Sequence, residues 1–170
     1  MNMDADQITI ESMAETDWRA VRAIYIEGIE SKNATFEKSA PEWPTWNDAH
    51  LKTCRIVARS ANVILGWAAL SSVSTRHVYH GVAEVSIYVS ACARGKKIGS
   101  RLLATLIERS EQNGIWTLQA GVFPENIPSI KLHKQNGFRV LGFREKVGCM
   151  DGNWRDVCLL ERRSKVVVNP

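Results

Sequence analysis

Residues 83–103 read AEVSIYVSACARGKKIGSRLL, and this stretch decides the fold. Polar and apolar residues alternate from Val82 to Val89, which predicts a β-strand. A basic, glycine-containing turn follows. From Ile98 to Asn113 apolar residues recur at helical spacing, and Gly114 supplies a C-terminal cap. The stretch therefore predicts a strand, a turn and a helix in direct succession.

The turn between this strand and helix has the chemistry of an anion site. The first N–H groups of a helix have no intrahelical partner, and the helix dipole favours negative charge there. A pyrophosphate suits such a site. Gly99 is followed by Ser100 and Arg101, so the turn is no Walker loop. An ordinary basic turn remains the alternative on spacing alone. The turn residues are Arg94, Gly95, Lys96, Lys97, Ile98, Gly99 and Ser100.

The rest of the chain predicts further strands and helices on both sides of this segment. Strands are expected at 8–11, 56–58, 63–71, 82–89, 116–123, 140–144 and 155–160. Helices are expected from Trp18 to about Gly28 and at 46–53, 98–113 and 128–136. This order predicts an α/β (α+β) fold, with a central mixed, mostly antiparallel sheet flanked by helices on both faces.

Length and composition indicate one soluble globular domain. The chain has 170 residues, and we expect a single domain over 1–170, ordered from about 8 to 162, with a frayed start and a frayed tail after Arg163. The net charge of +4 comes without a long Lys/Arg run, so nucleic acid is not expected as a partner.

Neither a membrane nor a metal is expected. No window approaches the ~18 apolar residues that a membrane span needs, and the start has no apolar stretch typical of a signal peptide. Cys54, Cys92, Cys149 and Cys158 lack metal-ligand spacing. We therefore expect a cytoplasmic protein with reduced thiols.

The basic turn resembles motif A of the GCN5-related N-acetyltransferases (GNAT). Arg94 and Gly99 match the ends of the family's Q/R-x-x-G-x-G/A loop, while Lys97 stands where the family has its first glycine. Residues 126–138 resemble the family's N-x-x-A-x-x-x-Y-x-x-x-G-F segment, with His133 at the tyrosine position. The resemblance implies acetyl-CoA as cosubstrate. The cofactor-binding residues it implies are Ile87, Tyr88, Val89, residues 94–100, Asn126 and Ser129.

A histidine at position 133 resembles one subgroup, the phosphinothricin and methionine sulfoximine acetyltransferases. The stretch from Ala83 to Val89 and the segment 150–156 resemble that subgroup's motifs too, and the resemblance covers residues 8–162. It implies Phe36, Arg76 and Tyr79 as substrate-binding residues. It also implies a homodimer in which a late hairpin carrying Trp154 lies at the interface.

Glu84 and His133 are the predicted catalytic residues. A protonated amine cannot attack a thioester, and a positioned carboxylate is a suitable proton acceptor. His133 would protonate the departing CoA thiolate or relay a proton. The alternatives are a solvated strand glutamate and a structural helix histidine.

Three functions therefore stay open. The first is acetylation, by direct transfer, of the α-amine of a small amino acid or analogue, with Arg76 binding an anionic group. The second is acetylation of another amine: a polyamine, an aminoglycoside or a protein N-terminus. The third is a CoA-binding module without catalysis.

Overall fold

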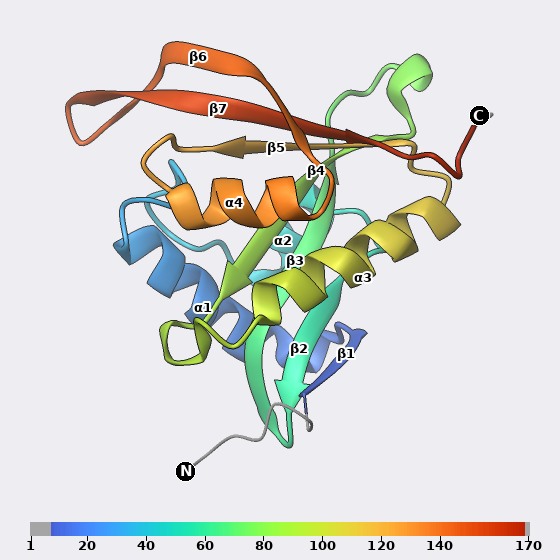
Figure 1. The fold of residues 1–170 in the computed structure, drawn as a ribbon. Helices are drawn as coiled ribbons and strands as arrows, with labels where there is room; N and C mark the ends of the chain where they lie inside the picture. Colours follow the sequence, from blue (N-terminus) through green and yellow to red (C-terminus); the bar gives the residue numbers. More distant parts are fainter. Residues whose placement is uncertain (1–7, 169–170) are drawn as a thin grey trace.

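The structure, a computed structural model, describes residues 8–168 and contains one seven-stranded sheet in the order β1-β2-β3-β4-β5-β7-β6 (Figure 1). The strands are β1 (Ile8–Ser12), β2 (Ile56–Ser60), β3 (Val63–Ser72), β4 (Val82–Val89), β5 (Thr117–Val122), β6 (Arg139–Met150) and β7 (Asn153–Arg163). All neighbouring strands are antiparallel except β4 and β5. The predicted mixed, mostly antiparallel sheet is confirmed.

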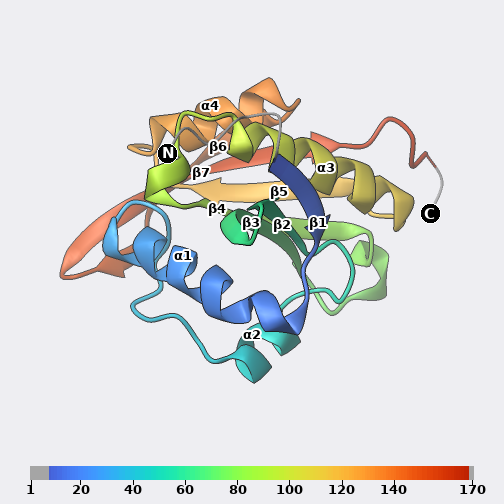
Figure 2. The same cartoon turned by 90° about the horizontal axis from the view of Figure 1, so that it is seen from below.

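Helices cover both faces of the sheet. They are α1 (Trp18–Glu30), α2 (Trp43–Ala49), α3 (Ile98–Gln112) and α4 (Ile127–Gln135), with short 3₁₀ turns η2 (Glu15–Asp17), η3 (His77–Tyr79) and η4 (Ala91–Ala93). Figure 2 shows α1 and α2 on one side of the sheet and α3 and α4 on the other. Among the described residues no helix is both long and apolar enough to cross a membrane.

Each face of the sheet has its own apolar core. Leu102, Leu103 and Leu106 form the buried stripe of α3 and pack in the larger core. On the opposite face, Trp46 and Trp67 are each 1% exposed and pack against α1. These tryptophans are therefore packing residues.

Several element boundaries differ from the prediction. The helix expected at 46–53 begins at Trp43, because Pro44 fits the first helical turn, where its missing N–H costs no bond. The last two strands are longer than predicted and form one extended hairpin. Ser164 is buried and its N–H donates to Trp116 O at 2.8 Å, so the chain remains ordered past Arg163. The predicted frayed start lies outside the described residues.

The sheet opens between β4 and β5. These strands pair only at Val82–Thr117, Ala83–Leu118 and Glu84–Gln119. Beyond Glu84, β4 continues along β3, whereas β5 continues along β7, and the two strands diverge (Figure 1). This divergence leaves a wedge between β4 and β5 in the middle of the sheet.

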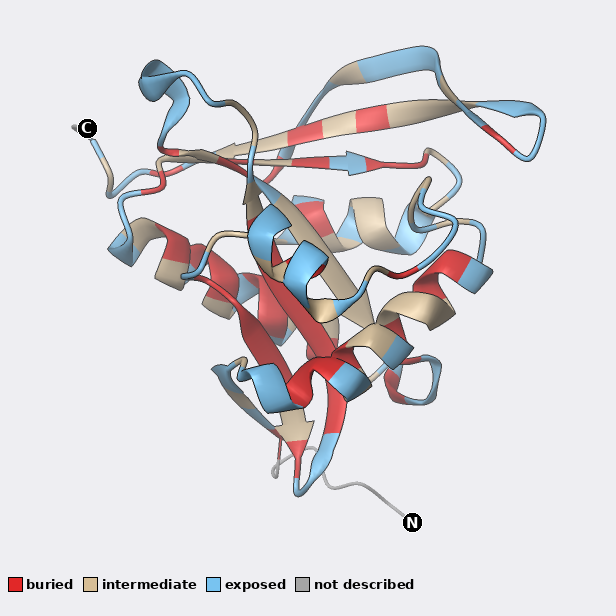
Figure 3. Cartoon of the chain, turned by 180° about the vertical axis from the view of Figure 1, so that it is seen from behind, coloured by how far each residue is buried: buried red, intermediate tan, exposed pale blue. Residues whose placement is uncertain are grey.

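The outer edge of the sheet is exposed. Figure 3 shows β6 largely in the colour of exposed residues, beside a better covered β7. Phe143 on β6 and Trp154 on β7 are each 63% exposed, which is high for large apolar side chains.

Candidate active site

The β4 edge that faces the wedge carries unpaired backbone groups. Ser90 N donates to Leu65 O at 2.9 Å, so this N–H points toward β3. Successive residues of a strand direct their N–H groups to opposite sides. The N–H groups of Val89 and Ile87 therefore face the wedge, beyond the point where pairing with β5 ends. They are available to a ligand that enters between the strands.

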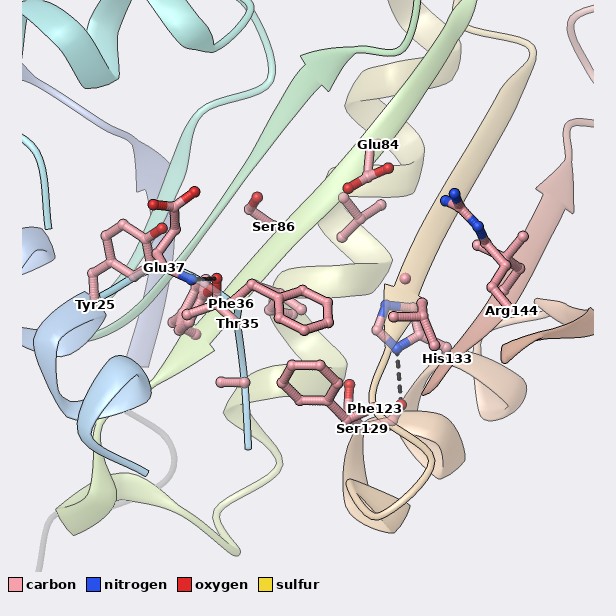
Figure 4. A pocket seen from close by; sticks show the side chains of 17 residues that line it. Tyr25, Thr35, Phe36, Glu37, Glu84, Ser86, Phe123, Ser129, His133 and Arg144 are labelled. Carbon is pink, nitrogen blue, oxygen red and sulfur yellow. Dashed lines mark hydrogen bonds between the residues drawn. The ribbon is translucent and has the colours of Figure 1, made fainter. Parts of the chain in front are cut away.

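A cavity of about 410 Å³ lies beside the wedge. Its walls come from β4, the segment between α1 and α2, the β5–α4 region and the β6–β7 hairpin, all far apart in sequence (Figure 4). The predicted site residues that line it are Phe36, Glu84, Ile87, Tyr88, Ser129 and His133.

Glu84 is the last residue of β4 that pairs with β5, and it lines the cavity. Its carboxylate oxygen Oε2 accepts a hydrogen bond from Gln119 Nε2 at 3.0 Å. Since the side chain is exposed and retains further acceptor capacity, it can receive a proton from a group in the cavity.

His133 is 2% exposed and lines the same cavity from α4. Its Nδ1 lies 2.8 Å from Ser129 O, which as a carbonyl can only accept, so Nδ1 carries the proton. Nε2 is then an unprotonated acceptor, and within residues 8–168 it is buried without a hydrogen-bond partner. Burial lowers the pKa of His133, so the ring is neutral at pH 7.

Phe36 forms an aromatic wall of the cavity. Its ring meets Phe123 edge-on at 4.8 Å between centroids. A Cβ atom at Gly148 of β6 would lie 2.6 Å from the Phe36 ring, so the absence of a side chain there permits the contact. Phe36 thus packs between the hairpin and the start of the β5–α4 connection.

Arg155 contacts several of the segments around the Phe36 side of the cavity. Its guanidinium donates to Lys32 O at 3.0 Å, bonds Glu125 Oε2 at 3.1 Å and lies 4.0 Å over the Phe123 ring. Three segments that border the cavity therefore meet at one side chain of β7.

Two tyrosines cover the far end of the cavity. Tyr25 and Tyr88 have ring centroids 4.9 Å apart, and Tyr88 stacks on Trp67. Burial raises the pKa of both hydroxyls, and the Glu37 carboxylate raises that of Tyr25 further. Both therefore remain neutral hydrogen-bonding groups.

The basic turn forms the N-terminus of α3 and lies outside the cavity lining. No side chain of the described chain caps this helix. Gly95 has φ +77° and Lys97 has φ +59°, so the lysine adopts the left-handed conformation that glycine adopts readily. Lys97 thus takes the backbone conformation of the glycine that stands at this position in the family's loop. The remaining turn residues form the expected uncapped, basic helix start.

Asn126 has local partners at both ends of its amide. Its Oδ1 accepts from Ser129 N at 3.2 Å and caps α4, while Nδ2 donates to Asn33 O at 3.0 Å. These bonds place Asn126 beside the cavity and leave it out of the lining. Contact with the cosubstrate stays a prediction for this residue.

Arg76 and Tyr79 also lie outside the cavity. They belong to the exposed connection between β3 and β4, with the Arg76 guanidinium 5.4 Å from the Tyr79 ring centroid. The nearby rings of His77 and His80 are 4.8 Å apart. Within residues 8–168, no group of three potential ligands is placed to hold a metal ion.

Two charged lining residues escaped the sequence reasoning, Glu37 and Arg144. Glu37 directly follows the predicted Phe36, which is the one signal that pointed to it. Arg144 stands at the end of the predicted strand 140–144, but the sequence alone did not show which face of that strand borders the cavity.

Comparison with known proteins agrees with this fold. The model of the acetyltransferase (GNAT) family matches residues 17–138. YwnH of Bacillus subtilis (strain 168), provisionally named a phosphinothricin acetyltransferase, is 32% identical over 161 residues, covering 91% of this chain and 98% of that protein. The L-methionine sulfoximine/L-methionine sulfone acetyltransferase of Pseudomonas paraeruginosa (strain DSM 24068 / PA7) is 27% identical over 159 residues, covering 90% and 92%.

A solved structure shares the fold. The phosphinothricin acetyltransferase from Sinorhizobium meliloti, solved in complex with acetyl-CoA, superposes with a TM-score of 0.83 at 28% identity. The match covers 92% of this chain and 88% of that one. The chain therefore belongs to the GNAT family, and it is an N-acetyltransferase. The resemblance to the phosphinothricin and methionine sulfoximine subgroup is confirmed among its relatives.

Proposed function

We propose that this protein transfers the acetyl group of acetyl-CoA directly to the α-amine of a small amino acid or amino-acid analogue. The observation that carries the proposal is the meeting of a carboxylate and a buried, neutral imidazole in one cavity at the wedge between β4 and β5. Phosphinothricin and methionine sulfoximine, named for the relatives, are the acceptors to test first.

Acetyl-CoA would span two regions. The basic, uncapped start of α3 offers N–H groups and cationic side chains to the pyrophosphate. The thioester would then lie in the wedge, where the N–H groups of Ile87 and Val89 point. Donors in that position stabilise the negative charge that develops on the thioester oxygen.

Glu84 would remove the proton from the acceptor's ammonium group. The freed amine nitrogen attacks the thioester carbon, and the carbon–sulfur bond then breaks. Gln119 holds one carboxylate oxygen of Glu84, which limits its rotation. Proton transfer to a positioned base typically contributes 10²- to 10⁴-fold in rate.

His133 would move the second proton. Its Nε2 carries no proton in the resting enzyme, so it can accept one from the attacking nitrogen and return it to the CoA thiolate. This assigns His133 a relay role rather than that of an acid already protonated.

Glu37 favours one rival acceptor class. The cavity contains two carboxylates, Glu37 and Glu84, against one guanidinium, Arg144. A second carboxylate suits an acceptor with two amines, such as a polyamine. The same enzyme chemistry would then act on a cation.

The proposed assembly is a homodimer. The edge strand β6 exposes Val140, Leu141 and Phe143, and Trp154 lies on the adjoining β7. Exposed apolar side chains on an edge hairpin are unfavourable in a monomer, and a second copy would cover them.

CoA release measured across a panel of amines tests the function. The panel contains phosphinothricin, methionine sulfoximine, common amino acids, spermidine and an aminoglycoside. Saturable turnover of the amino acids or their analogues supports the proposal. Turnover of spermidine alone replaces the acceptor class with a polyamine. Bound acetyl-CoA without turnover of any amine would leave a non-catalytic module.

A further inference from the structure

We propose that Arg144 binds the carboxylate of the acceptor and thereby sets the preference for amino acids over simple amines. This inference rests on the proposed function, since it assumes that the acceptor enters the cavity beside Glu84. It assigns to Arg144 the part that the sequence assigned to Arg76.

The first observation is that the Arg144 guanidinium has no protein partner. Most arginines of the described chain donate to a carbonyl or form an ion pair, as Arg155 and Arg162 do. Among residues 8–168, the guanidinium groups without such a bond are those of Arg19, Arg76, Arg94, Arg109 and Arg144, of which Arg109 donates to the Ser12 hydroxyl instead. Of these, only Arg144 lines the cavity.

The second observation concerns which anion reaches this arginine. Arg144 lies on β6, paired with Val157 of β7, whereas the basic turn lies at the start of α3 (Figure 1). None of the turn residues 94–100 lines the cavity. On the proposed function the phosphates of the cosubstrate bind at that turn, so an anion bound by Arg144 would belong to the acceptor.

The third observation is the order of charges along the cavity. Glu84 on β4 and Arg144 on β6 border it from different strands, with His133 beside them (Figure 4). They do not form an ion pair with each other within 4.0 Å. An α-amino acid carries an ammonium group next to a carboxylate, so its two charges match this pair. A guanidinium fork binds a carboxylate through two parallel hydrogen bonds.

Arg76 is less well placed for the same task. Both arginines are exposed, but Arg76 lies in the β3–β4 connection with its guanidinium against Tyr79, and neither of these two residues lines the cavity. The sequence predicted Arg76 as the residue that binds the anionic group, whereas the structure places Arg144 and not Arg76 at the cavity.

The test compares each acceptor with its uncharged derivative. kcat/KM is measured for L-methionine sulfone and for its α-carboxamide, in wild type, Arg144→Gln, Arg144→Lys and Arg76→Gln. The matched control is Arg139→Gln, which removes the same group from an exposed position on the same strand. Acetyl-CoA affinity and thermal unfolding show that each variant is folded.

We expect the acid-to-amide ratio to fall roughly 10- to 100-fold in Arg144→Gln, the usual effect of losing hydrogen bonds to a charged group. Arg144→Lys should recover part of it, and Arg139→Gln should leave it unchanged. A ratio that survives Arg144→Gln, or collapses only in Arg76→Gln, overturns the inference while the proposed function stands. Turnover of polyamines without any amino acid overturns both.

Discussion

The basic turn and the cavity differ in how the chain builds them. The turn is one contiguous segment at the start of α3, and the groups it would offer to the proposed cosubstrate are backbone N–H groups and nearby cations. The cavity is assembled from five or more separated segments, and its binding groups are side chains. A site made of backbone at a helix start depends on local conformation, whereas a site made of side chains depends on packing across the whole sheet. We therefore expect substitutions in the two regions to change different measured quantities.

The largest expected effect separates chemistry from cosubstrate binding. Glu84→Gln should lower kcat by about 10²- to 10⁴-fold, because the amide cannot accept the amine proton. The dissociation constant of acetyl-CoA should change by less than about twofold, since on the proposed function the cosubstrate phosphates bind at the turn, outside the cavity. Steady-state kinetics and calorimetry measure the two quantities.

Glu145→Gln is the matched control for this change, because Glu145 is an exposed carboxylate on β6. It should leave kcat as in wild type. A Glu84→Gln enzyme with normal turnover would show that another group, or bulk water, accepts the proton.

The next effect tests how far the cavity depends on packing. Arg155→Gln removes the bonds to Lys32 O and Glu125 and the contact with the Phe123 ring. We expect about 1–3 kcal/mol lower stability in urea, because a charged group with several acceptors is lost. The acceptor KM should rise several-fold while acetyl-CoA affinity is retained. Equal changes in both constants would contradict the separation of the two sites.

The pH dependence is a third and smaller test of the cavity. Burial lowers the pKa of His133, and of His50 on α2, below the value of about 6.5 in the unfolded chain. As pH falls below 6.5 the unfolded chain binds protons that the folded chain does not, so the free energy of unfolding decreases. His133→Phe should flatten this dependence without abolishing it, because His50 remains. Urea unfolding at pH 5 to 8 measures the slope, and an unchanged slope would contradict a buried, neutral His133.

The smallest effect concerns the turn. Lys97 has φ +59°, a conformation in which a side chain costs about 1 kcal/mol relative to glycine. Lys97→Gly should therefore raise the free energy of unfolding by up to about 1 kcal/mol. Lys96→Gly, at a position without positive φ, should lower it instead. If both variants are destabilised, the turn conformation in solution differs from the one described.

The same contrast explains what could be predicted from the sequence. The strand Val82–Val89, the turn and the helix from Ile98 were predicted to the residue or nearly so, because alternation, helical spacing and Gly114 are local signals. Glu84 and His133 were found through motifs that also lie on single elements. Their meeting in one cavity depends on how α4 packs beside the wedge.

The acceptor residues show where such prediction stops. Arg144 lies on a strand whose facing is set by its pairing with β7 and by irregular registers in the hairpin, which no local pattern encodes. Arg76, by contrast, was predicted from its position relative to β4, and the structure places it in the exposed connection. The other contacts between distant segments could not be predicted either, because they too depend on packing and register and not on a local sequence pattern.

On the proposed function, the short pairing of β4 with β5 would also make the stability of the protein depend on how much acetyl-CoA the cell contains. On the proposed function, a cosubstrate whose extended amide groups bond the β4 edge is bound by the folded chain alone. At a concentration 100 times its dissociation constant, such a ligand stabilises the fold by about 2.7 kcal/mol. When acetyl-CoA is scarce, the empty protein would unfold more often and meet proteases more often. The lifetime of the enzyme would then follow the abundance of the molecule that it consumes.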